Sequence, residues 1–212
     1  MLNQARFANL WQRLGGQGDA NELFATLLAA YAEPQRAYHN VAHLQDCLAQ
    51  FDAARDEAQH PDAVEMAIWF HDAVYDPRAT DNEEQSAAWA IQALTAGSIE
   101  PTTVQHIAEL VLSTQHKAVP TDQDAALLAD VDLSILGRAP AIFDAYDRQI
   151  RNEYHWVPEH QYCTRRAQVL AGFLARPRIY QTKHFYAQYE KQARENLARA
   201  IDRLATWMIV YC

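Results

Sequence analysis

The chain has 212 residues, of which 50% are hydrophobic and 21% are charged. These are ordinary values for a globular protein, and the length is sufficient to bury a sizeable core. Lys and Arg total 18 against 27 Asp and Glu, so the formal net charge is −9. This balance argues against a broad nucleic-acid-binding surface, because such a surface must be positively charged.

The sequence also gives expectations about compartment. No segment approaches the roughly 18 consecutive apolar residues of a membrane span. The N-terminal segment MLNQARFANLWQRLGGQG has no long apolar stretch and no small-residue cleavage pattern, so we do not expect a signal peptide. The three cysteines, Cys47, Cys163 and Cys212, are widely spaced and form no CxxC motif. We therefore expect a reduced, cytoplasmic protein without a membrane partner.

Helical patterning dominates the whole chain. Alanine and leucine recur throughout, apolar residues fall at helical spacing, and only six glycines occur, so the sequence predicts an all-α fold. We expect ten helices, punctuated by prolines and glycines, over about 2–14, 20–31, 40–58, 61–71, 81–95, 101–113, 124–136, 140–154, 158–175 and 183–209. No linker separates them, so we expect one domain over residues 1–212 with its core at about 20–175.

Histidines and carboxylates recur in a pattern that suggests a metal site. His71 and Asp72 follow the apolar stretch AVEMAIWF, where both side chains of a helix end can turn toward one ion. His39 and His43 are four residues apart on the expected third helix, so they would share a face. The segment LLADVDLSIL places Asp130 and Asp132 in an apolar helix, and a buried carboxylate needs a partner. Imidazole and carboxylate together suit a divalent cation.

These motifs resemble those of the HD-domain superfamily of metal-dependent phosphohydrolases. The resemblance rests on AYHNVAHLQDCL, WFHDAVYD and LLADVDLSILG. It is closest to a bacterial subgroup of HD hydrolases described only by prediction, and it extends through YDRQIRNEY, RRAQVLAGFLARPRIY and EKQARENL. It implies an HD-type helical bundle of about nine to ten helices that holds one divalent ion.

The resemblance also implies a ligand set and a reaction. The implied metal ligands are His43, His71, Asp72 and Asp132, with Asp130 as the alternative to the last of these. The ion would be Mn, Fe, Co, Ni, Zn or Mg. A metal-activated water would then hydrolyse a small phosphate ester or a nucleotide.

Dinuclear HD proteins add two histidines, for which this chain offers His106 and His116. Ten helical residues rotate by about 1000° and advance about 15 Å, so these two imidazoles do not converge on a continuous helix. One metal ion is therefore the favoured prediction.

The residues that would assist catalysis are less clearly marked. Some single-metal HD hydrolases carry a Glu four residues after the His of the pair, whereas this chain has Tyr75. The candidates for proton transfer are Asp76, Glu83 and His116, although Glu83 could equally be a favourable charge at a helix N-terminus. The candidates for substrate binding are His39, Tyr75, Lys117 and Arg151.

Three other interpretations stay open. A diiron HD-type oxygenase would need the two further histidines. A catalytically silent HD module would bind a nucleotide without turnover, which the missing Glu makes credible. A structural protein would leave the motif as a coincidence. The expected partner is a small phosphorylated molecule or nucleotide, and no nucleic acid is expected. The C-terminal segment TWMIVYC is apolar enough to form a homodimer interface, but packing into the chain's own core is the favoured interpretation.

Overall fold

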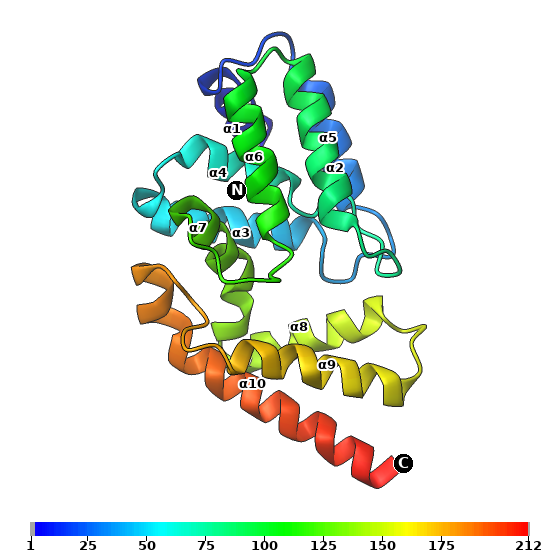
Figure 1. Ribbon diagram of the computed structural model, residues 1–212. Coiled ribbons are helices and arrows are strands. Elements are labelled where there is room, and N and C mark those ends of the chain that lie inside the picture. The colour runs from blue at the N-terminus through cyan, green and yellow to red at the C-terminus, as the bar shows by residue number, and fades with distance from the viewer. Residues whose placement is uncertain (1–2, 212) are drawn as a thin grey trace. The chain divides into compact units, whose positions relative to one another are not determined.

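The computed structural model describes the backbone of residues 3–211 and the side chains of residues 3–206. Over this range the protein has ten α-helices, two short 3-10 helices and no strand, which confirms the predicted all-α fold. The chain divides into two compact units, residues 1–132 and 133–212 (Figure 1). The expectation of a single domain stays a prediction. None of the helices described is both long and apolar enough to span a bilayer.

The first unit is built around helix α4 (Pro61–Phe70). The eight residues from Ala63 to Phe70 are all buried, as expected for a helix that is apolar on nearly every face. It contacts every other helix of the unit. In Figure 1, α5 and α6 run side by side above it. The other helices are α1 (Gln4–Arg13), α2 (Asn21–Tyr31), α3 (Val41–Ala54), α5 (Asn82–Ala96), α6 (Pro101–Ser113) and α7 (Gln123–Asp132).

One charged residue lies within the buried stretch of α4. Glu65 is 2% exposed and lies against three arginines. Its carboxylate accepts from Arg6 at 2.7 Å, from Arg55 at 2.5 Å and from Arg13 at 3.4 Å. Arg6 and Arg13 belong to α1, and Arg55 begins the 3-10 helix η1 (Arg55–Glu57) that follows α3. A buried carboxylate is tolerated here because it is paired with several cations.

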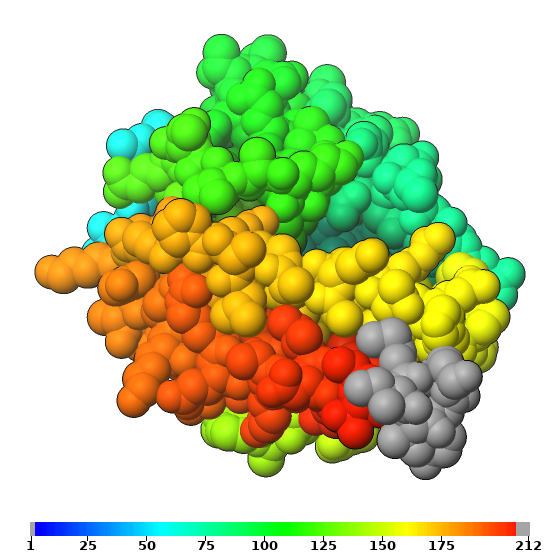
Figure 2. Space-filling view, turned by 60° about the horizontal axis from the view of Figure 1, so that its bottom comes forward, coloured from blue at the N-terminus to red at the C-terminus, as the bar shows by residue number. Residues whose placement is uncertain are grey.

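The second unit contains the 3-10 helix η2 (Leu133–Gly137), α8 (Pro140–Glu153), α9 (Glu159–Leu174) and α10 (Lys183–Tyr211). Helices α9 and α10 lie alongside each other, as Figure 2 shows for one face. The side-chain amide of Asn196 donates to the carbonyls of Leu136 at 2.9 Å and Arg138 at 2.8 Å, which fixes η2 on α10. The side chains of 207–212, which include most of the apolar segment considered as a homodimer interface, lie outside the described residues.

Three local expectations were wrong. The third helix ends at Ala54 and the seventh at Asp132, and the chain tightens into 3-10 turns after each. His39 is not helical, because the extended backbone of Asn40 and its side chain, which accepts from the backbone N–H of Ala42 at 2.8 Å, begin the helix at Val41. His39 therefore reaches the neighbourhood of His43 from the preceding turn.

Candidate metal centre

Four side chains that the sequence singled out come together within the first unit. The Nε2 atoms of His43 and His71 are 3.1 Å apart. An oxygen of Asp72 lies 3.3 Å from the His43 nitrogen and 3.1 Å from the His71 nitrogen. An oxygen of Asp132 lies 3.3 Å from His43 and 3.8 Å from His71. The carboxylate that joins the imidazoles is therefore that of Asp132, the residue preferred over Asp130.

Three helices deliver these groups. His43 is in the first turn of α3, His71 is the C-cap of α4 with Asp72 directly after it, and Asp132 is the last residue of α7. Helices α3, α4 and α7 pack against one another in pairs. All four groups therefore lie at or near helix ends. Successive residues inside a helix point about 100° apart around its axis, whereas at a helix end the side chains of His71 and Asp72 can turn toward the same point.

The tautomer of His71 is fixed by its surroundings. Its Nδ1 lies 2.8 Å from the carbonyl oxygen of Ile68. Because a carbonyl only accepts hydrogen bonds, Nδ1 must carry a proton and donate it. The neutral ring then has its lone pair on Nε2, which faces the cluster. A backbone acceptor behind a metal-binding histidine has the same orienting effect in known metal sites.

The Asp72 carboxylate gives the clearest test of whether these residues fit a cation. Its Oδ2 atom is buried and has no hydrogen-bond partner, although two imidazole nitrogens lie within 3.3 Å. Nitrogen and oxygen ligands at about 2.0–2.2 Å from one tetrahedral ion are about 3.4 Å apart. The separations between the imidazole nitrogens and each carboxylate, 3.1–3.8 Å, are close to this value. The two histidines can therefore share one divalent ion with either carboxylate, and an ion bound to Asp72 would give its buried oxygen a partner.

The charges of the cluster are strongly coupled. Burial alone would lower the pKa of His43 and His71, but the neighbouring Cys47, Tyr38 and the carboxylates raise the pKa of His43, and Asp72 raises that of His71. Burial alone would raise the pKa of Asp72 and Asp132, but His71 holds the pKa of Asp72 well below its usual range, and His116 and His43 do the same for Asp132. Without an ion, positive charge on the imidazoles and negative charge on the carboxylates therefore stabilise each other.

This coupling predicts how the stability of the metal-free protein depends on pH. The raised pKa of His43 and His71 means that their stabilisation is complete below about pH 6.5 and is lost as pH rises through the folded-state pKa. The lowered pKa of Asp72 and Asp132 means that theirs is present above about pH 4 and is lost as pH falls. The melting temperature of chelator-treated protein should therefore decrease between pH 6 and pH 9.

The measurement is thermal unfolding of the stripped protein across this pH range. His160→Gln removes an imidazole from the exposed surface of α9 and should leave the slope unchanged. A melting temperature that is flat or rises from pH 6 to pH 9 would contradict the assigned protonation states. Adding a divalent ion should reverse the trend, because metal binding requires neutral imidazoles.

His116 extends the cluster by one group. Its Nε2 lies 2.8 Å from the second oxygen of Asp132. Its backbone has φ of +52°, in the left-handed region that residues with a side chain rarely adopt. Strained backbone of this kind concentrates at functional sites. The structure thus places His116 beside Asp132. Its role in proton transfer stays a prediction.

Cys47 is a further group at the centre that the sequence motifs did not indicate. It is buried one helical turn after His43, and its Sγ lies 3.6 Å from Nε2 and 3.7 Å from Nδ1 of that histidine. With His43, His71 and Asp132 it forms a set of ligand atoms that are all within 4.8 Å of one another. The i, i+4 spacing in HLQDC is the signal that could have found it.

His39 and Tyr75 border the cluster as a stacked pair. Their ring centroids are 4.2 Å apart with an interplanar angle of 29°, and the ring of His39 is 5.7 Å from that of His43. Arg36 is buried beneath them and donates to the carbonyl oxygens of Asp72 at 2.6 Å and Ala73 at 3.0 Å. The guanidinium N–H groups of Arg36 therefore hold the backbone turn that carries Asp72.

The other two candidates for proton transfer lie on the loop and helix that follow. The Asp76 carboxylate accepts from the backbone N–H of Arg78 at 2.9 Å, and its backbone is held by Asn82 at 3.0 Å and 2.9 Å. The contact with Arg78 is an Asx turn, which fixes the conformation of the loop. Glu83 lies in the first turn of α5, where a carboxylate favours the positive end of the helix. These positions support a local structural role for both residues, and their catalytic roles stay predictions.

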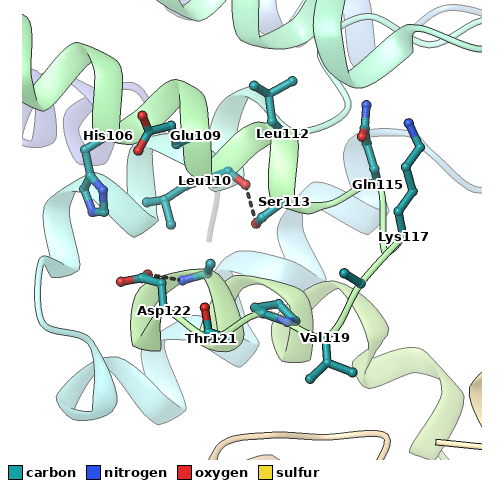
Figure 3. Close-up of a pocket in the computed structure, with 13 residues that line it drawn as sticks. His106, Glu109, Leu110, Leu112, Ser113, Gln115, Lys117, Val119, Thr121 and Asp122 are labelled. Carbon is teal, nitrogen blue, oxygen red and sulfur yellow. Dashed lines mark hydrogen bonds between the residues drawn. The ribbon is translucent and has the colours of Figure 1, made fainter.

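The two basic candidates for substrate binding have different surroundings. Lys117 lines a cavity of about 440 Å³ between α6 and α7, with His106 at its opposite end (Figure 3). Arg151 belongs to the second unit. Its guanidinium donates to Glu159 at 2.7 Å and to the carbonyls of Tyr154 and Val157. These contacts hold the turn between α8 and α9 and give no support to a role in substrate binding.

Comparison with known proteins identifies no relative. No family model, no curated protein and no solved structure matches the chain. The likeness to HD-domain hydrolases therefore rests on the motif residues alone.

Proposed function

We propose that this protein is a metal-dependent phosphohydrolase of the HD type that acts on a small phosphate ester or a nucleotide. The observation that carries the proposal is the buried Asp72 oxygen without a hydrogen-bond partner, 3.1 Å from the His71 nitrogen and 3.3 Å from the His43 nitrogen. His43, His71, Asp72 and Asp132 would hold one divalent ion. When bound, the ion would lower the pKa of a water molecule and offset charge on a phosphoryl oxygen.

The protein groups would then orient and exchange protons. The hydrogen bond from His71 Nδ1 to Ile68 keeps Nε2 free to ligate. His116 is positioned by Asp132 to give or take a proton at Nε2, and the stacked rings of His39 and Tyr75 would form one wall for the substrate. The acidic balance of the chain disfavours a long polyanion as substrate. A diiron oxygenase is disfavoured because His106 contacts Asp124, far along α7 from Asp132.

The test is a hydrolysis screen of protein stripped of metal and then loaded with Mn, Fe, Co, Ni, Zn or Mg. Phosphomonoesters, phosphodiesters and nucleotides are offered, and released phosphate or the cleaved product is measured. We expect turnover with at least one metal and none in the stripped protein. Nucleotide binding without turnover would support the silent module instead. An absence of metal binding by the four-residue cluster would overturn the proposal.

A further inference from the structure

We propose that His60, His106 and Asp124 form a second divalent-cation site, of the zinc class, that joins α4, α6 and α7. The three ligand atoms lie within 4.8 Å of one another. An oxygen of Asp124 is 2.9 Å from His60 Nδ1 and 3.5 Å from His106 Nε2. Two imidazoles and one carboxylate are a ligand set that zinc accepts, with water completing the tetrahedron.

The buried atoms of the cluster point to a missing partner. Asp124 is fully buried, and its two oxygens accept the backbone N–H groups of Gln59 at 2.6 Å and His60 at 2.9 Å. His106 Nε2 is also buried, yet it has no hydrogen-bond partner. It faces the Asp124 oxygen at a distance close to the roughly 3.4 Å expected between two ligands of one tetrahedral ion. An ion bound between these atoms would take the His106 nitrogen as a ligand and so give it a partner.

The site is also accessible. The side chain of His60 is 65% exposed, and that of His106 is 29% exposed. His106 lines two cavities of about 440 Å³, one beside Lys117 (Figure 3) and one beside His60. An ion and its water ligand therefore have a path from solvent. On binding, the proton shared by His60 Nδ1 and Asp124 would pass to solvent, while Asp124 keeps its two backbone donors.

This site is separate from the first. His60 precedes His71 by eleven residues along α4, and Asp124 precedes Asp132 by eight along α7. At 1.5 Å per residue these separations are about 16 Å and about 12 Å. Two ions of a dinuclear centre are only about 3.5–4 Å apart. The second ion would therefore act as a structural clamp on the N-terminal ends of the two helices whose other ends carry His71 and Asp132.

The test uses the full chain, stripped of metal, and Zn²⁺ as the probe. Equilibrium dialysis with elemental analysis gives the number of ions bound per chain. We expect two for the native sequence, one for His71→Ala, one for His106→Gln and none for the double variant. His160→Gln, which removes an exposed imidazole from α9, should still bind two. The two sites share no ligand. The number of Zn²⁺ ions lost in His106→Gln therefore tests this proposal whether or not the first site hydrolyses phosphate esters.

Thermal unfolding supplies a second readout. Zn²⁺ should raise the melting temperature of His71→Ala by several degrees, and His106→Gln in the same background should abolish this shift. If His106→Gln does not fold, His60→Gln replaces it, because that side chain is mostly exposed. The proposal is overturned if His71→Ala binds no Zn²⁺ at about 100 μM, or if its bound Zn²⁺ survives both substitutions.

Discussion

Replacing His71 by alanine should remove the ion of the candidate centre and reduce kcat/KM for phosphate-ester hydrolysis by roughly a thousandfold or more. The imidazole would supply one of four ligands, and its loss leaves Asp72 and Asp132 without the His71 charge that lowers the pKa of both. An unmetallated centre also loses the activated water, whose pKa a bound ion can lower from 15.7 to about 7. Elemental analysis and steady-state kinetics on the same preparation measure both effects.

His160→Ala is the matched control, because it removes an imidazole from the exposed surface of α9. It should change neither metal content nor kcat/KM. If His71→Ala fails to fold, Asp132→Asn tests the same centre with a side chain of nearly equal volume. Turnover that persists at the native rate after the ion is lost would show that hydrolysis does not take place at this cluster.

Replacing Glu65 by alanine should lower the free energy of unfolding by about 3–5 kcal/mol, the cost of removing one partner from a buried ion-pair network. The carboxylate is 2% exposed and ties Arg6 and Arg13 of α1 to Arg55 of η1. Without it, the three guanidinium groups keep only the more exposed carboxylates of Asp52 and Asp62 as partners. Urea denaturation monitored by circular dichroism measures the change.

Arg13→Ala provides the comparison, because Arg13 is 44% exposed and contacts Glu65 only at 3.4 Å. It should cost less than about 1 kcal/mol, as exposed pairs do. A loss below about 1 kcal/mol for Glu65→Ala would mean that the network contributes little and that α1 is held on α4 by apolar packing alone.

The sequence was informative where the determinants are local. Prolines and helical spacing predicted the ten helices, with bounds within two residues except at the ends of the third and the seventh, and Pro61, Pro101 and Pro140 each begin one. The order of His43, the His71–Asp72 pair and Asp132 along the chain predicted four groups that the fold brings together. His39 was placed on a helix in error, because the capping side chain of Asn40 outweighs the helical spacing of the two histidines.

The rest depended on contacts between distant segments, which periodicity does not encode. Cys47 joins the centre only because α3 turns its His43 face toward α4. His60 and Asp124 are 64 residues apart, and Glu65 meets Arg6 across 59 residues. His60, Asp124 and Glu65 each have an ordinary local setting as a cap or helix charge. Their partners are set by helix packing, so no motif of a few residues could have revealed them, whereas Cys47 has a local signal in its spacing from His43.

The position of His71 at the end of α4 has an electrostatic consequence. A helix carries about half a unit of negative charge at its C-terminus, and α4 ends at Phe70 directly before the candidate ligands. That end of the helix, together with Asp72 and Asp132, attracts a cation and repels a phosphate group. Ion and phosphorylated ligand should therefore be thermodynamically linked, each raising the affinity for the other by the same factor. Occupancy by the substrate would then act to retain the ion when its supply is low.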